Sequence, residues 1–278
     1  MGNPRLISVI TVVKNDLVGL GLTLESLSNL DFVERIIVDG GSKDGSAELA
    51  EAYSDLKIQS KEDGGIYQAM QRGASKAESK YIIFINAGDS LFSGNNLLKA
   101  IDELDSSGSE WGFGPIVEKS TWGTSFLVKV PGEISTESIS RRSTYVPFPS
   151  VIMRKELFQS VVGFNTKFKI AGDFELVIRL AKSNLPTRWD FPLVVFEAGG
   201  VSYTSAPKAW LEEIRARKLN GINCGIINEI TRLSFKVTRW SLGQILDKLQ
   251  SFKILGKTHW RERLRSGAKF IEPNRSSP

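Results

Sequence analysis

Cysteine and histidine are almost absent from this chain of 278 residues, which contains one of each, Cys224 and His259. Disulfide frameworks, zinc sites made of Cys and His, and Ser–His or Cys–His catalysis all need more of these residues than the chain has. Any acid–base or metal chemistry must therefore depend on Asp and Glu, with Lys and Arg left to contact anionic groups. A single cysteine also agrees with a reducing compartment.

Long apolar runs are missing too. No stretch approaches the roughly 18 consecutive apolar residues of a membrane-spanning helix, so no membrane span is predicted. The first six residues lack the charged, apolar and small-residue zones of a signal peptide. Hydrophobic residues make up 41% of the chain and charged residues 24%, so the chain has enough apolar side chains for a sizeable core. We therefore expect a cytoplasmic protein.

Positive charge is concentrated at one end of the sequence. Residues 201–278 contain 15 Lys and Arg against 6 Asp and Glu, whereas the rest of the chain contains 21 against 25. Trp and Phe residues are interspersed among these cations. The segment fits either a solvated helical cap or a surface that binds anionic membranes. Nucleic acid is not expected as a partner, because no known binding module accompanies the charge.

Strand and helix signals alternate over the first hundred residues. Apolar, β-branched runs predict buried strands, and leucines and alanines at helical spacing predict helices between them. The predicted strands cover residues 6–13, 33–38, 56–59 and 81–85, and the predicted helices cover 17–30, 47–53 and 66–77. This rhythm with short loops favours an α/β fold with an open, mostly parallel, Rossmann-like sheet flanked by helices.

The later sequence changes character. Gly, Ser, Thr and Pro increase over residues 108–150, where short alternating segments predict antiparallel strands and long loops. A helix is expected over 176–181 and a final strand over 188–197. From residue 206 onward the pattern is helical, over 206–220 and 226–246, and ends in a charged tail. We expect one domain over 1–205, followed by a basic helical extension over 206–278.

Polar and acidic residues follow each of the four predicted strands, as KND (14–16), DGGSKDGS (39–46), DGG (63–65) and NAGD (86–89). Each one alone could be an ordinary turn, because Asp, Asn and Gly are good turn residues. Ligands of open parallel sheets, however, collect at the carboxyl ends of the strands. Four such turns in register therefore indicate a ligand site.

Two common nucleotide-binding schemes are excluded. A dinucleotide-binding domain needs G-x-G-x-x-G after its first strand, where this chain has Lys14-Asn15-Asp16 without glycine. No G-x-x-x-x-G-K-[ST] phosphate loop occurs anywhere in the sequence. Nucleotide binding must follow another scheme.

Several motifs in the same order resemble the family 2 glycosyltransferases of the GT-A fold, over roughly residues 6–202. Residues 7–15 (ISVITVVKN) resemble the opening strand of that family. Residues 37–46 (IVDGGSKDGS) are similar to its V-D-D-G-S-x-D-G-S signature, with Gly40 in place of the second Asp. Further similar segments are 63–73 (DGGIYQAMQRG), 85–89 (INAGD, at the place of the D-x-D motif) and 163–176 (GFNTKFKIAGDFEL). The resemblance implies a donor half over about 1–107 and an acceptor half over about 108–205.

The resemblance also implies a site for a nucleotide-sugar donor. Val13 and Asn15 would lie at this site, at the end of the first strand. Asp39 would accept a hydrogen bond from the base, and Asp63 would act near the base or ribose. Asn86 would bond a ribose hydroxyl.

A divalent ion is implied as the cofactor. Asp89 would bind Mg²⁺ or Mn²⁺, which prefer hard oxygen ligands and would bridge the two phosphates of the donor. The usual motif offers more acid, because its first Asp is Asn86 here and the next acidic position is Gly88. The diphosphate would supply the remaining oxygens.

Asp173 stands where the family keeps its catalytic base, at the start of a helix. An inverting transfer needs a carboxylate that removes the proton of the acceptor hydroxyl. An alternative role for Asp173 is that of a helix N-cap. Glu175 is the reserve candidate, although the apolar residues after it indicate a packing helix. On the acceptor side the family often has a polar His-Gln where this chain has Phe148-Pro149.

We therefore expect an inverting, metal-assisted glycosyltransferase of surface polysaccharide biosynthesis. It would use a nucleotide diphosphate sugar, UDP-linked by preference, and a glycan or lipid-linked acceptor. Asp39, Asp63 and Asp89 would converge on one crevice that Asp173 faces. Through residues 206–278 the protein would be peripheral on the inner face of the membrane. Two alternatives stay open: a non-catalytic sugar-nucleotide or glycan-binding protein, which the thinned NAGD motif favours, and a nucleotidyltransferase, which the glycine-free turn after the first strand disfavours.

Overall fold

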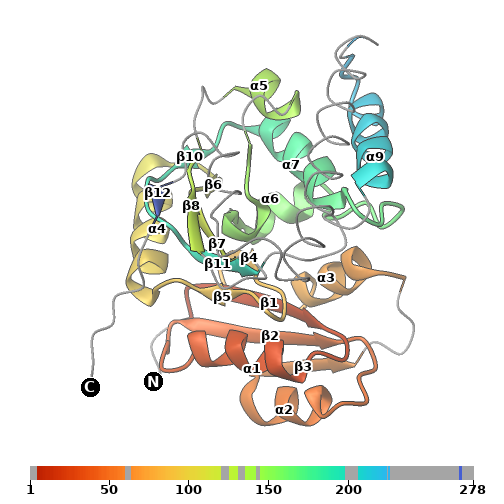
Figure 1. Cartoon of the computed structure of the whole chain (residues 1–278). Helices are drawn as coiled ribbons and strands as arrows, with labels where there is room; N and C mark the ends of the chain where they lie inside the picture. Colours follow the sequence, from red (N-terminus) through yellow and green to blue (C-terminus); the bar gives the residue numbers. More distant parts are fainter. Residues whose placement is uncertain are drawn as a thin grey trace, which may run out of the picture.

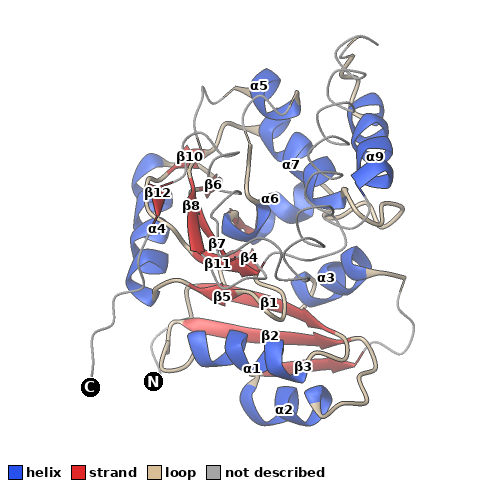
Figure 2. Ribbon diagram, viewed as in Figure 1, coloured by secondary structure: helices blue, strands red, loops and turns tan. Residues whose placement is uncertain are grey.

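The computed structural model describes residues 5–59, 64–119, 125–130, 135–141, 145–197, 206–223, 225 and 269–270. Its helices surround two sheets (Figures 1 and 2). The helices are α1 (Leu17–Ser26), α2 (Ser46–Tyr53), α3 (Ile66–Ala74), α4 (Gly94–Ser107), α5 (Thr136–Ser140), the short 3₁₀ helix η1 (Phe148–Ser150), α6 (Lys155–Ser160), α7 (Gly172–Ser183) and α9 (Ala206–Leu219).

The larger sheet has seven strands in the order β10-β6-β9-β4-β1-β2-β3. Its central strands β4, β1, β2 and β3 are parallel, whereas β9 runs antiparallel to both β4 and β6. The strands are β1 (Ile7–Val13), β2 (Val33–Asp39), β3 (Leu56–Gln59), β4 (Tyr81–Phe84), β6 (Trp111–Phe113), β9 (Ile152–Arg154) and β10 (Thr187–Arg188). The expected α/β fold with a mostly parallel sheet is confirmed.

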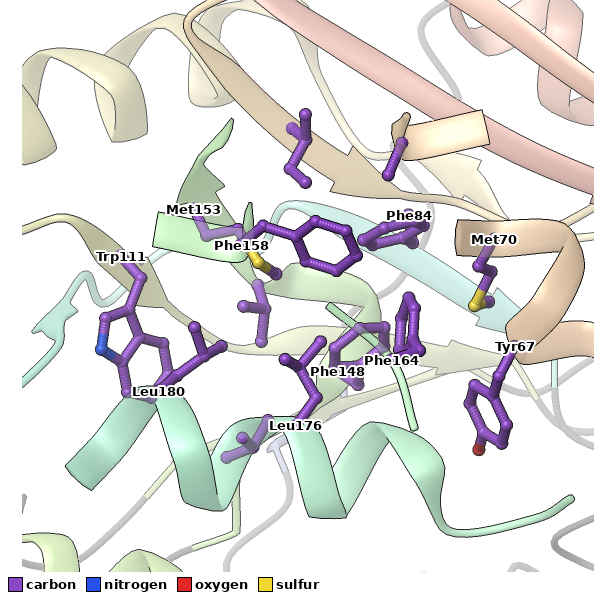
Figure 3. Packing of buried hydrophobic residues seen from close by; sticks show 14 of the residues in the cluster. Tyr67, Met70, Phe84, Trp111, Phe148, Met153, Phe158, Phe164, Leu176 and Leu180 are labelled. Carbon is purple, nitrogen blue, oxygen red and sulfur yellow. The ribbon is translucent and has the colours of Figure 1, made fainter. Parts of the chain in front are cut away.

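Both faces of this sheet are covered, which explains the unbroken apolar strands. Along β1, Val13 packs with α1 and α2, whereas Ile10 on the other face belongs to the cluster that includes α3, α6 and α7. The latter cluster contains a group of aromatic rings, in which Phe164 contacts Phe84, Phe148, Phe158 and Tyr67 (Figure 3). The rings fix the segment before α7 against the sheet.

A second sheet of five strands lies beside the first, in the order β12-β8-β7-β11-β5. Its strands are β5 (Ser90–Leu91), β7 (Ile116–Lys119), β8 (Ser125–Val128), β11 (Val194–Glu197) and β12 (Lys269–Phe270). β5 follows the turn at the end of β4 and pairs antiparallel with β11. This pairing brings residues more than 100 positions apart to the same turn.

Helix α9 opens the basic extension and packs on α7 (Figure 1). Ala209, Glu213, Ala216 and Arg217 are buried, so this helix belongs to the folded body. Among the described residues, no helix has both the length and the apolar character needed to cross a bilayer.

The predicted elements of the first hundred residues are confirmed, with helices α1 and α3 ending a few residues earlier than expected. The strand predicted over 188–197 is wrong in its middle: it divides into β10 and β11, which belong to different sheets. Pro192 lies between them and cannot donate a ladder hydrogen bond. The predicted helix over 206–220 is confirmed as α9, the one over 226–246 lies outside the described residues, and the two residues of β12 form a strand where a charged tail was expected.

Candidate functional site

The turns after β1 and β2 form one unit at the carboxyl edge of the sheet. The carbonyl of Val13 accepts the N–H of Gly40 at 2.8 Å. The N–H of Asn15 donates to Oγ of Ser42 at 2.8 Å, and its Oδ1 accepts the N–H of Lys43 at 2.9 Å. Asn15 has a left-handed backbone with φ of 51°, which asparagine tolerates. Val13 and Asn15 thus hold the glycine-rich turn in place.

Asp39 ends β2 and is fully buried. Its carboxylate accepts the N–H of Gly41 at 3.2 Å and the N–H of Ser42 at 3.1 Å. Gly41 has a positive φ of 80°, a conformation that glycine adopts without strain. Asp39 therefore organises the turn that it begins, with lone pairs left for a further donor.

The turn after β4 is held from two sides. The N–H of Ala87 donates to the carbonyl of Val12 in β1 at 3.2 Å. Oγ1 of Thr23 in α1 lies 2.6 Å from the carbonyl oxygen of Asp89 and 3.2 Å from that of Asn86. Among the described residues, Oδ1 of Asn86 is a buried atom without a hydrogen-bond partner. The turn therefore offers an acceptor that a ligand hydroxyl could satisfy.

Asp89 is a buried carboxylate, 5% exposed. Its Oδ1 accepts the N–H of Glu197 at 3.1 Å. Burial raises the pKa of Asp89 to about 7, and the nearby negative charge of Glu197 adds to the rise, although the N–H bond opposes it. The charged form of Asp89 thus needs a compensating cation.

Two further carboxylates surround Gly88, the position where the family motif has an acid. A Cβ atom on Gly88 would lie 3.8 Å from Oδ2 of Asp16 and 3.9 Å from Oε2 of Glu197. The other oxygen of Asp16 caps α1, and the other oxygen of Glu197 pairs with Lys119 at 3.5 Å. Asp16 belongs to the KND turn expected at the ligand site but was assigned no role of its own, and Glu197 was not predicted, because it is far away in sequence.

A metal site of three protein ligands is not formed: no group of three or more His, Cys, Asp or Glu residues in the described part of the chain is arranged to hold an ion. Asp89 offers one buried carboxylate, an oxygen donor that suits a hard cation. The donor set therefore fits an ion that takes most of its ligands from a bound diphosphate and water.

Asp63, expected at the third strand tip, lies outside the described residues. The described chain resumes at Gly64, whose N–H donates to Oε1 of Gln68 in α3 at 2.7 Å. Next to it is Tyr67, which is 6% exposed and points from α3 towards the start of α7 (Figure 3).

Asp173 is the second residue of α7, and the N-cap is Ala171, so the alternative role of Asp173 as N-cap is wrong. Its Oδ1 accepts the N–H of Phe174 at 2.8 Å and lies 3.2 Å from the hydroxyl oxygen of Tyr67. Burial and the charge of Asp173 raise the pKa of Tyr67 above its ordinary value, so the phenol stays protonated as a donor.

Glu175 is occupied by structural contacts. It is 3% exposed and its Oε2 pairs with Arg179 at 2.6 Å. Arg179 also donates to the carbonyl of Gly163 at 2.6 Å. Glu175 thus belongs to a packing helix, as its sequence context indicated.

A hollow opens beside Asp173 and is otherwise lined by apolar and aromatic side chains: Ile139, Tyr145, Val146, Phe148, Phe174 and Val177. The hollow is small, with a volume of about 20 Å³, so it has room for one water-sized group such as a hydroxyl beside the carboxylate. Phe148 is 8% exposed, whereas Tyr145 is 44% exposed. A carboxylate in an apolar wall can accept a proton from a hydroxyl presented to it.

Known proteins resemble this chain along most of its length. The model of the family described as Glycosyl transferase family 2 matches residues 8–161. An uncharacterized glycosyltransferase of Mycobacterium tuberculosis is 29% identical over 229 residues, 77% of this chain and 84% of the relative. The PGL/p-HBAD biosynthesis glycosyltransferase of Mycobacterium bovis is 26% identical over 206 residues, 70% of this chain and 77% of the relative.

Solved structures share the fold. The crystal structure of S. aureus TarS 1–349 in complex with UDP superposes with a TM-score of 0.62 and 20% identity, covering 84% of this chain and 71% of TarS 1–349. The complex of the same protein with UDP-GlcNAc gives a TM-score of 0.60 with 18% identity, covering 84% and 72%.

Proposed function

Because the chain belongs to glycosyl transferase family 2, and is therefore a glycosyltransferase, we propose that it moves a sugar from a UDP-sugar to a hydroxyl of a lipid-linked glycan or other lipid-linked acceptor, with inversion. The observation that carries this proposal is Asp173, a carboxylate in the first turn of α7 that lines a small hollow and lies 3.2 Å from the hydroxyl oxygen of Tyr67.

A nucleotide-sugar donor would bind at the carboxyl edge of the sheet. TarS, which has the same fold, is known in complexes with UDP and with UDP-GlcNAc. This chain is 20% identical to TarS or less, so the choice of UDP is part of the proposal. Asp39 would accept from the base, with Val13, Asn15 and Asp63 around the nucleotide. The unpaired Oδ1 of Asn86 would accept a hydrogen bond from a ribose hydroxyl.

Asp89 would hold Mg²⁺ or Mn²⁺, with Glu197 and Asp16 adding negative charge on either side of Gly88. When bound, such an ion neutralises the charge that builds on the leaving diphosphate. The chain itself would supply a fixed, buried carboxylate and a turn that α1 keeps in shape.

On the acceptor side, Asp173 would remove the proton of the attacking hydroxyl. The attack on the anomeric carbon comes from the side opposite the diphosphate, which inverts the configuration. The acidic side chain in the first turn of α7 also has a favourable interaction with the helix dipole.

The apolar lining of the hollow supports a lipid-linked acceptor. Phe148 and Pro149 stand where the family often has His and Gln, and Phe148 faces the space beside Asp173. A free sugar would leave its other hydroxyls against this wall without hydrogen-bond partners, at a cost that an apolar group avoids.

Replacing Asp173 by Asn tests the proposal. The wild type, given radiolabelled UDP-sugars and Mn²⁺, should transfer sugar or slowly hydrolyse one of them. Asp173→Asn keeps the size of the side chain and its contact with Tyr67 but cannot accept a proton, so turnover should fall about 100- to 10,000-fold. Thermal stabilisation by UDP should remain.

Asp102→Asn is the control, because Asp102 is an exposed residue on α4 away from these turns. Its turnover should equal that of the wild type. If the wild type binds UDP-sugars but never consumes any of them, the assignment of catalysis fails and the chain is a binding protein.

A further inference from the structure

We propose that Glu212, in the C-terminal helix α9, is a positioning residue for sugar transfer: through the backbone of residues 169–171 it fixes the carboxylate of Asp173. The proposal depends on the proposed function, in which Asp173 is the proton acceptor. It assigns to the extension a part in the reaction as well as any part in membrane binding.

Glu212 binds three consecutive backbone N–H groups. Its Oε2 accepts the N–H of Ile170 and that of Ala171, each at 2.8 Å, and its Oε1 accepts the N–H of Lys169 at 2.9 Å. These residues directly precede the first turn of α7, in which Asp173 is the second residue. A single carboxylate from α9 therefore sets the path of the chain into that turn.

The same segment is held from the other side by Tyr67. The phenol oxygen of Tyr67 lies 2.6 Å from the carbonyl oxygen of Ile170 and 3.2 Å from Oδ1 of Asp173. The peptide group between Ile170 and Ala171 thus accepts from Tyr67 at its carbonyl and donates to Glu212 at its N–H. A shift of this peptide would move the phenol donor away from the Asp173 carboxylate.

The space around this peptide leaves little room for adjustment. A Cβ atom on Gly172 would lie 2.7 Å from the ring of Tyr67, closer than side chains pack, so the ring lies against the backbone. Lys169 also donates through Nζ to the carbonyl of Gly64, in the turn before α3. Residues 64–67, residues 169–173 and Glu212, which are distant in sequence, therefore meet next to Asp173.

Other residues dock α9 independently of Glu212. Ala209 and Ala216 are buried, and the buried guanidinium of Arg217 lies 5.6 Å from the centre of the Phe174 ring. Arg215 lies 5.2 Å from the centre of the Phe168 ring. Loss of the Glu212 charge should thus loosen residues 169–171 while α9 stays in place.

Glu212→Gln tests the inference. In the wild type, three N–H groups donate to the two carboxylate oxygens of Glu212. The amide of Gln offers only one acceptor oxygen, and its NH₂ group, itself a donor, repels the N–H groups that this oxygen cannot bind. We expect kcat for donor hydrolysis or transfer to fall about 10- to 100-fold, because small misplacement of a reacting group has effects of this size. The donor KM and the stabilisation by UDP should stay near wild-type values, whereas the melting temperature should fall moderately, because backbone N–H groups lose an acceptor. All values of Glu156→Gln, an exposed control on α6, should equal those of the wild type.

A double-mutant cycle separates positioning from general stability. Tyr67→Phe removes the hydroxyl that holds the same peptide and the same carboxylate. If both residues act through this peptide, Tyr67→Phe combined with Glu212→Gln should lower kcat by clearly less than the product of the two single effects. Amide hydrogen exchange of residues 169–171 should become faster in Glu212→Gln, a readout that needs no substrate.

The inference would be overturned by unchanged kcat in a folded Glu212→Gln protein, by multiplicative effects in the cycle, or by unchanged exchange at residues 169–171. A loss of UDP stabilisation together with kcat would do so as well, because it would indicate a general structural role. If Asp173→Asn is as active as the wild type, the proposed function fails. If Asp173→Asn is inactive and Glu212→Gln fully active, only the positioning inference fails.

Discussion

Asp89 has its carboxyl group buried beneath the turn after β4, where the N–H of Glu197 is its hydrogen-bond donor. Burial raises its pKa from 3.8 to about 7. Between these values the folded protein binds more protons at Asp89 than the unfolded chain does. The free energy of unfolding therefore falls as the pH rises from about 4 to about 7, and the full penalty applies above that.

Asp89→Asn should remove this penalty, because the amide stays neutral and its oxygen can still accept from Glu197. Without divalent ions, the variant should be more stable than the wild type at pH 8 by on the order of 2 to 4 kcal/mol, and by clearly less at pH 5. Urea unfolding in EDTA at both pH values measures this difference. A gain of the same size at pH 5 and pH 8 would mean that Asp89 does not titrate as described.

Among the elements, helix α1 supports the turn after β4 through its hydroxyl side chains. Thr23 is fully buried and its Oγ1 lies 2.6 Å from the carbonyl oxygen of Asp89. Oγ of Ser26 accepts the N–H of Leu91 at 2.9 Å, just beyond that turn. The helix thus fixes both ends of the segment that carries Asp89.

Thr23→Val keeps the shape of the side chain but removes the donor. Unfolding should become easier by about 1 to 3 kcal/mol, because buried carbonyls lose their partner. UDP with Mn²⁺ should stabilise the variant less than the wild type in a thermal melt. Thr23→Ser retains the hydroxyl and should keep the response to UDP, so equal responses of Val and Ser variants would contradict the supporting role of α1.

Local sequence patterns predicted the central strands of the large sheet and the turns that follow them. Strands β1, β2 and β4 are short apolar runs, and the turns after them are adjacent in sequence to the strands that place them. The pairing of Asp89 with the backbone of Glu197 joins positions 108 residues apart, and that of Glu212 with Lys169 joins positions 43 residues apart. Only the packed structure brings such partners together. Neither the position of Glu197 near Gly88 nor the contact of Glu212 with residues 169–171 could therefore be predicted from the sequence.

At the element level the failures have local causes. The amphipathic helix α4 received no prediction, although Leu97, Ile101 and Leu104 are buried along one side. The strand expected over 188–197 is interrupted at Pro192, which disfavours a continuous strand, and the chain passes there from one sheet to the other.

At the scale of the whole molecule, the domain boundary expected at residue 205 separates two helices that pack against each other. α9 packs on α7, and its buried Arg217 covers Phe174. The cation of Arg217 is buried over the ring of Phe174, so membrane binding through residues 206–278 would depend on the other cations of this segment.

Two shortened proteins test this division. A chain ending at residue 205 loses α9 and uncovers Phe168 and Phe174, so its melting temperature should fall by about 5 °C or more. A chain ending at residue 225 keeps α9 and loses the two-residue edge strand β12, so its melting temperature should fall clearly less than that of the chain ending at residue 205.

The same two proteins test membrane binding. Both should sediment less with anionic liposomes than the full chain does, and the difference should be largest at low salt. Equal melting temperatures of the two would contradict the docking of α9. Undiminished sedimentation of the chain ending at residue 225 would contradict the membrane proposal.

The bond between Glu212 and the segment before α7 also determines where two relatives could be recombined. A hybrid joined after residue 225 would exchange the terminal region and keep the segment before α7 together with the α9 helix of the same parent. A hybrid joined at residue 205 would pair the loop of one parent with the helix of the other, so its loss of turnover would reflect mismatched partners at the proton acceptor and not the new terminus.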